Sequence, residues 1–224
     1  MSVIDRLRRR YWQYRVRYPV TAKPSDAFGL RYIPTIEPYY SDDADFIFGS
    51  RMPVDEEVTQ RNLHKLTEIF LAKRDACRTI MEIGVCRNED RSFTHVFLKH
   101  KRNDATYLGV DLEDKSFLDD PARAIYTLKA DSTKQSVVRA KLRELGMAAL
   151  DVLFIDGWHS VNAVVNDWRY TDLLAQDGVV IMHDTNCHPG PVCVFDAVDE
   201  RLFRKQKCFQ KEPDWGMAVL QRVR

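Results

Sequence analysis

The 224-residue chain lacks the features of a membrane protein or a nucleic-acid binder. No apolar run approaches the roughly 18 residues that span a bilayer, and the arginines near the N-terminus are not followed by an apolar stretch. The formal net charge is only +1, which argues against a general nucleic-acid binder. We therefore expect a cytoplasmic protein with no nucleic-acid partner and no stable membrane insertion.

Cysteine and glycine are also sparse. The five cysteines form no C-x-x-C pair and are odd in number, which favours reduced thiols over a disulfide framework. Cys187, His188 and Cys193 lie close together, but their spacing matches no common zinc finger. None of the nine glycines forms a G-x-G-x-x-G pattern, so the dinucleotide-binding fingerprint is absent and an NAD-dependent reductase is disfavoured.

The N-terminal part differs in composition from the rest. Residues 1–24 carry seven basic and one acidic side chain, whereas residues 25–60 carry two basic and eight acidic ones. Ten of the chain's aromatic residues precede residue 50, which predicts packing across the domain or against a second subunit rather than a free disordered arm. The acidic and aromatic stretch 39–54 is a candidate lid. We take residues 1–54 as an extension with a possible role in homo-oligomerisation, and residues 55–224 as the main domain.

Short apolar runs alternate with helix-like segments from residue 55 onwards. Strands are expected at 79–83, 107–110, 125–128, 152–155 and 179–182. Helices are expected before the first run, after it, between the third and fourth runs and between the fourth and fifth. One more should follow Pro191 with Val194, Phe195, Val198 and Leu202 on it. Residues 207–210 and 217–223 look like a closing antiparallel pair. The alternation predicts an α/β fold: a doubly wound, Rossmann-like, mostly parallel seven-stranded sheet with a C-terminal antiparallel pair.

Two of the apolar runs end in carboxylates, one at Asp156 and the other at Asp184. They flank a crossover of helix length, which is the sequence form of a β-α-β unit. Parallel strands bind ligands beyond their carboxyl ends, and neighbouring strands lie about 4.8 Å apart. If these two strands are neighbours, Asp156 and Asp184 could share one cation or one polar substrate, with His159 and His183 beside them.

Two earlier strand ends suggest a nucleoside ligand. Gly84 lies at a strand-to-helix turn, where a glycine lets the backbone approach a ligand. Without further glycines the turn offers no cradle for a pyrophosphate, so a nucleoside without phosphate fits better. Asp111 ends the next run, where such folds place an acidic group on ribose hydroxyls. A helix cap or loop residue is the alternative interpretation of Asp111.

The chain resembles class I S-adenosylmethionine-dependent methyltransferases through the order of its motifs: E-I-G-V, Y-L-G-V-D, L-K-A-D-S, L-D-V-L-F-I-D-G-W-H-S and G-V-V-I-M-H-D-T. It is most similar to the small-molecule O-methyltransferase group, which includes macrolide-sugar and catechol-type enzymes. The similarity covers roughly residues 79–223. Its most specific part is F-I-D-G-x-H-S followed by H-D-T, whereas Cys86 and Asn88 stand where the family usually has glycine.

The resemblance implies a role for each of the residues at the strand ends. The implied cofactor contacts are Glu82, Gly84 and Val85 at the methionine end, Asp111 at the ribose, and Asp131 and Ser132 by the adenine. Asp156 would lie next to the sulfonium as a metal ligand, with Asp184 as its partner. His183 stands where relatives often have a carboxylate, so it is the candidate third ligand. His159 falls where these enzymes keep their general base, and with Asp156 it forms the expected catalytic pair.

The chemistry of methyl transfer suits these residue types. S-adenosylmethionine carries its own leaving group, so the protein must mainly position a hydroxyl and remove its proton. A bound divalent cation lowers the pKa of a hydroxyl, and a histidine with an ordinary pKa of about 6.5 can accept the proton. Oxygen ligands suit Mg²⁺, whereas His183 as a ligand would favour Mn²⁺, Fe²⁺ or Zn²⁺.

The sequence thus predicts a metal-assisted O-methyltransferase that acts on a hydroxyl of a sugar or polyketide-like small molecule. The alternatives are a relative of the cephalosporin-hydroxylase type and a non-catalytic partner subunit that uses the fold as a binding module. Structural roles are also open for the site residues. Asp156 and Asp184 could only cap the helices that follow them, His159 could bond to the backbone, and His183 could orient Asp184.

Overall fold

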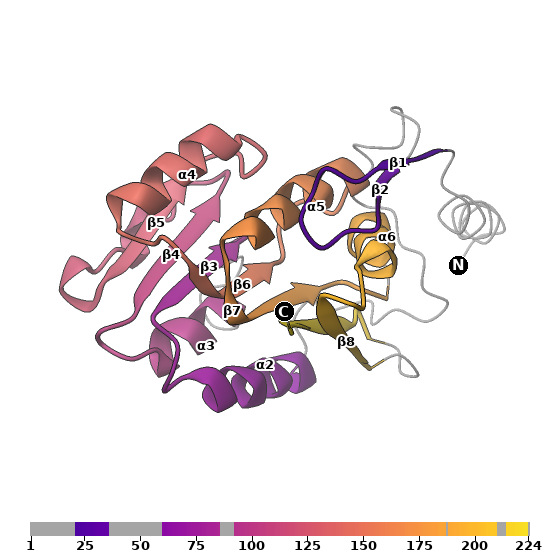
Figure 1. Ribbon diagram of the computed structural model, residues 1–224. Helices are drawn as coiled ribbons and strands as arrows, with labels where there is room; N and C mark the ends of the chain where they lie inside the picture. The colour runs from indigo at the N-terminus through magenta and orange to yellow at the C-terminus, as the bar shows by residue number, and fades with distance from the viewer. Residues whose placement is uncertain (1–20, 36–59, 86–91, 187, 210–213, 224) are drawn as a thin grey trace, which may run out of the picture.

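The computed structural model describes residues 21–35, 60–85, 92–186, 188–209 and 214–223. Its main element is a seven-stranded sheet in the order β5-β4-β3-β6-β7-β9-β8 (Figure 1). The strands are β3 (Thr79–Ile83), β4 (Thr106–Asp111), β5 (Ile125–Lys129), β6 (Leu150–Ile155), β7 (Leu174–His183), β8 (Phe203–Cys208) and β9 (Met217–Arg222). The first five strands of that order are parallel, and β9 is antiparallel to both β7 and β8. The predicted fold class is confirmed.

Helices cover both faces of this sheet, as Figure 1 shows. They are α2 (Gln60–Lys73), α3 (Phe93–His100), α4 (Gln135–Glu144), α5 (Val161–Trp168) and α6 (Pro189–Ala197). The apolar sides of α4, α5 and α6 form one buried cluster with the sheet, and those of α2 and α3 form a second cluster on the other face. The central strands β6 and β7 are buried on both faces, which explains their nearly continuous apolar runs. Within the described residues, none of the helices is long and apolar enough to cross a membrane.

The predicted strands match the observed ones at the centre of the sheet and depart from them at its C-terminal edge. The prediction that the helix after Pro191 extends to Leu202 is wrong, because α6 ends at Ala197 and Val198 turns into extended backbone. The strand predicted at 207–210 begins earlier, at Phe203. Along β8 the buried Phe203 and Cys208 enclose basic and polar residues. This composition is usual for an edge strand and weakens the apolar signal.

The N-terminal part of the described chain packs onto the domain. Two short strands, β1 (Thr21–Pro24) and β2 (Tyr32–Thr35), pair with each other, and β2 contacts α5 and α6. The indole Nε1 of Trp168 donates to the carbonyl of Phe28 at 2.8 Å. Gly29 has a positive φ of 77°, and a Cβ there would lie 2.4 Å from the Phe203 ring. The candidate lid at 39–54 lies outside the described residues.

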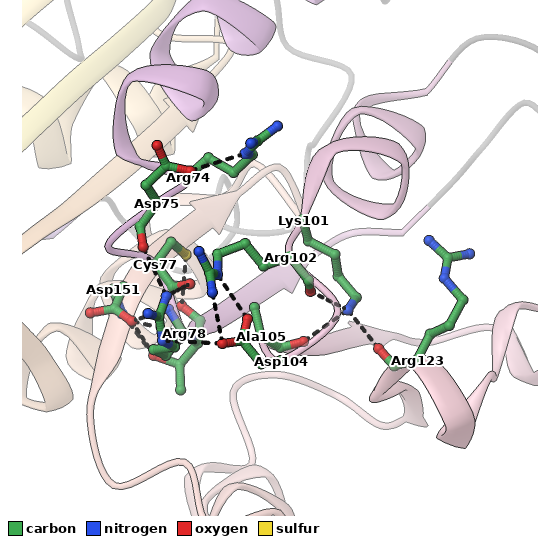
Figure 2. Close-up of polar contacts among 11 residues, drawn as sticks. Arg74, Asp75, Cys77, Arg78, Lys101, Arg102, Asp104, Ala105, Arg123 and Asp151 are labelled. Carbon is green, nitrogen blue, oxygen red and sulfur yellow. Dashed lines mark hydrogen bonds and ion pairs between the residues drawn. The ribbon is translucent and has the colours of Figure 1, made fainter.

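The amino-terminal ends of the central strands are held by hydrogen bonds to the backbone (Figure 2). One oxygen of Asp151 accepts from the backbone N–H groups of Arg78 and Thr79 at 2.7 and 3.0 Å, and from the Thr79 hydroxyl at 3.1 Å. The ammonium of Lys101 donates to three backbone carbonyls, those of Arg102, Ala105 and Arg123. Polar side chains at this edge hold loops and strands together. The residues predicted to be functional gather at the opposite, carboxyl edge.

Candidate active site

Strands β6 and β7 are parallel neighbours, so the two predicted carboxylates follow adjacent strand ends. Ile155 is paired with Met182, which puts Asp156 and the turn at Asp184 at the same edge of the sheet. Asp184 has a φ of 60°, in the left-handed region that aspartate tolerates better than most residues. The condition on which the sequence interpretation depended, that these strands are neighbours, is met.

Two carboxylates and two imidazoles form one buried group at these strand ends, which we name the strand-tip cluster: Asp156, His159, His183 and Asp184. The Nδ1 atom of His183 lies 3.1 Å from an oxygen of Asp156 and 3.2 Å from an oxygen of Asp184. The other oxygen of Asp184 lies 2.8 Å from Nε2 of His159. The side chain of Asp156 is the most exposed of the four at 19%, so the cluster is largely shielded from water.

Charges within the strand-tip cluster compensate one another. Burial raises the pKa of Asp156, although the neighbouring His183 opposes the rise. Burial acts in the same direction on Asp184, but the charges of His183 and His159 outweigh it and hold the pKa of Asp184 well below its usual value. Burial tends to lower the pKa of both histidines, yet the facing carboxylates leave both pKa values raised. Such pairing is what makes buried charge tolerable.

Residues that the sequence analysis did not assign complete the surroundings of the cluster. The ring of His188 stacks on the ring of His159 with centroids 4.1 Å apart, and the ring of Trp215 stacks on that of His188 with centroids 5.6 Å apart. Asn62, from α2, places its Oδ1 atom 2.9 Å from Nε2 of His183. Of these three residues, only His188 could have been suspected from the sequence, because it follows the predicted site residue Asp184 by four residues.

The donor atoms of the cluster fit a divalent cation. Asp156, His183 and Asp184 each offer one ligand atom, and these atoms lie within 4.8 Å of one another. A second set shares Asp184 and adds His159 and His188. Both sets mix carboxylate oxygen with imidazole nitrogen, a combination that suits transition ions as well as or better than Mg²⁺.

Gly84 lets the turn after β3 pack against the turn after β6. Its φ is 85°, and a Cβ at this position would lie 2.1 Å from the carbonyl oxygen of Asp156. The backbone N–H of Val85 donates to one oxygen of Asp111 at 2.7 Å, and Glu113 N–H donates to the other at 2.8 Å. Asp111 thus ties the end of β4 to the glycine turn, and its side chain remains partly exposed. The glycine is needed for a close approach of two backbone segments.

Glu82 lies inside the domain rather than at an open surface. Its carboxyl accepts a hydrogen bond from the Thr94 hydroxyl at 2.9 Å and another from the Tyr107 hydroxyl. Burial raises the pKa of Glu82 to about 8, against the effect of these two donors. Asp156 and Asp111 add to the rise, which places Glu82 near the same edge of the sheet. Glu82 is therefore a largely neutral acid beneath the strand ends.

Asp131 and Ser132 follow β5 and are held by hydrogen bonds from Thr133 and Tyr170. An oxygen of Asp131 accepts from the backbone and the hydroxyl of Thr133 at 2.9 and 2.6 Å, and the carbonyl of Ser132 accepts from Tyr170 at 2.6 Å. Among the described contacts, none joins these two residues to the strand-tip cluster.

Asp167, on α5, is a buried acid that the sequence analysis missed. Its side chain is fully buried, and burial raises its pKa to about 7. Ser132 and Asp131 lie close enough to affect that pKa, and Gly157 is close as well, since a Cβ there would lie 3.7 Å from an oxygen of Asp167. Asp167 therefore lies between the loops that follow β5 and β6.

No family model and no curated protein matches the chain. Solved structures do match it. The MycE methyltransferase of the mycinamycin pathway, in complex with Mg and SAH, is 17% identical with a TM-score of 0.52; the match covers 79% of this chain and 56% of that one. A methyltransferase from Geobacter sulfurreducens is 14% identical with a TM-score of 0.54, and the match covers 75% and 81%. The O-methyltransferase TomG from Streptomyces achromogenes, in complex with SAM, is 14% identical with a TM-score of 0.52, covering 76% and 83%.

The chain has the class I methyltransferase fold. The resemblance inferred from the sequence motifs is thereby confirmed at the level of the fold. The present chain spans little more than half of the mycinamycin methyltransferase that it matches. The strand order has β6 at the centre and β9 inserted antiparallel between β7 and β8. It places the strand-tip cluster at the carboxyl edge, where such sheets bind ligands.

Proposed function

We propose that this methyltransferase-fold chain is an S-adenosylmethionine-dependent O-methyltransferase that uses the strand-tip cluster for catalysis. The observation that carries the proposal is the convergence of two carboxylates and two imidazoles at the ends of neighbouring parallel strands. Structural acids usually have backbone partners, as Asp151 does at the opposite edge. Groups that face one another instead are suited to exchange a proton or to share a cation.

The proposed cofactor contacts follow the strand ends. S-adenosylmethionine would supply a methyl group on a good leaving group. Asp111 would hold the ribose, because its partly exposed carboxyl is already oriented by two backbone N–H groups. The remaining proposed contacts are Glu82, Gly84 and Val85 at the methionine end, and Asp131 and Ser132 by the adenine. For Glu82, the neutral state implied by its raised pKa would let the carboxyl donate a hydrogen bond to an acceptor.

The proposed metal ligands are Asp156, His183 and Asp184. A divalent cation, Mg²⁺ or another, would supply Lewis acidity that lowers the pKa of a bound hydroxyl. The side chain of Asp156 is the most exposed in the cluster, at 19%, so an acceptor would approach the metal from its side. Its backbone N–H donates to the carbonyl of Ile83 at 2.9 Å, which fixes the backbone of Asp156 at the strand end.

His159 is the proposed general base. Its Nε2 atom lies 2.8 Å from Asp184, so a proton taken up by the imidazole would be stabilised by a neighbouring negative charge. Stacking on His188 restricts the orientation of the ring. Because Asp184 raises the pKa of His159, we expect the rate to increase as the pH rises through that pKa.

The proposed acceptor is a hydroxyl of a sugar or polyketide-like small molecule. A solved MycE structure with this fold holds Mg, SAH and mycinamycin VI, and another neighbour is described as a TDP-rhamnose 3'-O-methyltransferase of calicheamicin biosynthesis. Residues 1–54 are the proposed extension that would shape the acceptor pocket and support homo-oligomerisation. Light scattering on a variant that lacks the first 24 residues tests the role in homo-oligomerisation. If this variant has the same number of subunits as the parent, the first 24 residues do not support the oligomer.

Calorimetric titration with S-adenosylmethionine tests the proposed function. We expect micromolar-range binding, together with a raised melting temperature because the cofactor binds the folded state. Binding should weaken in an Asp111→Ala variant and persist in Asp75→Ala, which alters an exposed acid at the other edge of the sheet. No heat of binding at about 1 mM cofactor, a concentration that would reveal even millimolar affinity, would contradict the proposal.

A further inference from the structure

Asn62 and Asp214 connect His183 to two distant parts of the chain. Asn62 belongs to α2, and Asp214 lies just before β9. We propose that they are positioning residues: they keep a proton on Nε2 of His183 and leave Nδ1 as a metal ligand, so that the cluster prefers Mn²⁺, Fe²⁺ or Zn²⁺ over Mg²⁺. This inference deepens the proposed function and rests on the metal site within it.

The hydrogen bonds of Asn62 determine which way its amide points. Its Nδ2 atom lies 3.0 Å from both oxygens of Asp214. An ionised carboxylate only accepts hydrogen bonds, so the amide must present its NH₂ group to Asp214. The opposite orientation would set the amide oxygen against two carboxylate oxygens. Asp214 is itself held by the backbone N–H of Gly216, which donates to it at 2.8 Å.

This orientation fixes the protonated nitrogen of His183. The Oδ1 atom of Asn62 faces Nε2 of His183 at 2.9 Å, and an amide oxygen is an acceptor. Nε2 must therefore carry the proton. Metal-binding histidines commonly donate their second N–H to such an acceptor, which fixes the ring and its tautomer. The nitrogen left for a ligand role is Nδ1, which faces the two carboxylates. Without a metal the facing carboxylates raise the pKa of His183, so Nδ1 also carries a proton, which a bound cation would displace.

The spacing around Nδ1 suits a coordinated ion. Nδ1 lies 3.1 and 3.2 Å from the oxygens of Asp156 and Asp184. Ligands about 2.1 Å from a divalent ion and at right angles to each other are about 3.0 Å apart. Imidazole nitrogen in such a set favours transition ions over Mg²⁺, which prefers oxygen.

Burial makes this chain of hydrogen bonds rigid. The exposed fraction is 0% for Asn62 and 3% for both Asp214 and His183. The Phe93 ring contacts the His183 ring edge-on with centroids 4.8 Å apart, which limits rotation of the imidazole. A buried polar chain that joins α2, β7 and the start of β9 would hold the ligand atom in place before a metal arrives.

Calorimetric metal titrations of the full chain test the proposal. We expect Mn²⁺ and Zn²⁺ to bind at least about 100-fold more tightly than Mg²⁺. Asn62→Leu should weaken Mn²⁺ binding by about 10- to 100-fold, because the ring loses its fixed proton and orientation. The matched control is Asn162→Leu, an exposed position on α5 that should bind Mn²⁺ like the parent. Equal affinities for Mg²⁺ and Mn²⁺ in the parent, or unchanged Mn²⁺ binding in Asn62→Leu, would overturn it.

Exchange of the two side chains separates positioning from simple packing. In the Asn62→Asp/Asp214→Asn double variant, the new carboxylate still accepts from Nε2 of His183 and receives the amide N–H of the new asparagine. Mn²⁺ affinity should return to within about threefold of the parent, whereas Asp214→Asn alone lets the amide turn and should weaken binding. A double variant as weak as Asn62→Leu would contradict the proposed role.

Spectroscopy on the parent provides a test that needs no variant of the buried chain. Nitrogen-15 shifts of the Zn²⁺-loaded protein should show His183 with a protonated Nε2 and a metal-bound Nδ1; the reverse assignment would overturn the inference. Cofactor titrations are run separately. If the protein binds S-adenosylmethionine but shows no metal selectivity, only this inference is contradicted. If it binds metals selectively but does not bind the cofactor, only the proposed methyl transfer is contradicted.

Discussion

The two edges of the sheet use the same residue types in different ways. At the amino edge, one oxygen of Asp151 accepts from two backbone N–H groups and a hydroxyl, and Lys101 donates to backbone carbonyls (Figure 2). At the carboxyl edge, Asp156 and Asp184 face imidazoles. Backbone partners cannot exchange a proton or give way to a cation, whereas imidazoles can do both. Asp111 and Asp131, also at the carboxyl edge, accept from backbone N–H groups. The partners of a carboxylate, rather than the edge at which it lies, therefore distinguish Asp156 and Asp184 from the acids that hold the backbone.

The largest effect should follow the loss of the general base at the carboxyl edge. His159→Ala removes the proton acceptor, so we expect the methyl-transfer rate to fall by about 10²- to 10⁴-fold while the dissociation constant for S-adenosylmethionine stays unchanged. Sugars and polyketides with free hydroxyls are first screened for a methyl acceptor, and the rate of methyl transfer is then measured with that molecule. His64→Ala, at an exposed position of α2, serves as the control and should keep the parent rate. An active His159→Ala enzyme would place the base elsewhere.

At the amino edge we expect a substitution to lower stability and to leave cofactor binding unchanged. Asp151→Ala leaves the backbone N–H groups of Arg78 and Thr79 without their acceptor, so the free energy of unfolding should fall by about 1–3 kcal/mol. Urea denaturation measures the change, and cofactor affinity should stay at the parent value. If Asp151→Ala lost catalysis without losing stability, the distinction between the two edges would fail.

Glu82 should make stability depend on pH. Its pKa is about 8 in the folded chain against an ordinary value of 4.5, because burial disfavours the charged form. Between these values the unfolded chain is ionised while the folded chain stays protonated, so stability falls as the pH rises. Relative to Glu82→Gln, the parent should lose about 1.4 kcal/mol for each pH unit in that window. Below pH 4.5 the difference should be constant. A parallel pH dependence of the two proteins would show that Glu82 is ionised when folded.

The smallest effect is expected for an exposed ion pair at the amino edge. Nε of Arg102 lies 2.8 Å from an oxygen of Asp104, and the two side chains are 38% and 54% exposed. Water screens such pairs, so Arg102→Ala should leave the melting temperature and cofactor affinity at their parent values. Differential scanning calorimetry at low and high salt provides the check. If high salt lowered the melting temperature of the parent but not that of Arg102→Ala, the ion pair would contribute more to stability than its solvent exposure allows.

The sequence was sufficient to predict the elements whose position follows from a local pattern of apolar and polar residues. Apolar runs located the central strands. The first one or two residues after three of these runs located Asp111, Asp156 and Asp184, because parallel strands bring their carboxyl ends together. The boundary between α6 and β8 was missed because the edge strand is rich in basic residues. An apolar pattern cannot mark a strand that is exposed along much of its length.

The surroundings of the site could not be read from the sequence. Asn62 is 121 residues from His183 and 152 residues from Asp214, and no motif joins them. Their association depends on how α2 packs against the sheet and on where β9 enters it. Asp167 was hidden for a similar reason: on a helix it looked like an ordinary polar residue, and only packing shows that its carboxyl is buried.

A crystal structure with S-adenosylhomocysteine and Mn²⁺, using the anomalous signal of the metal, tests the central claim most directly. The account predicts metal density between Asp156, His183 and Asp184, with the cofactor sulfur at the same strand ends and beside His159. A cofactor bound elsewhere, or side chains that fill the space in front of the strand-tip cluster, would contradict it.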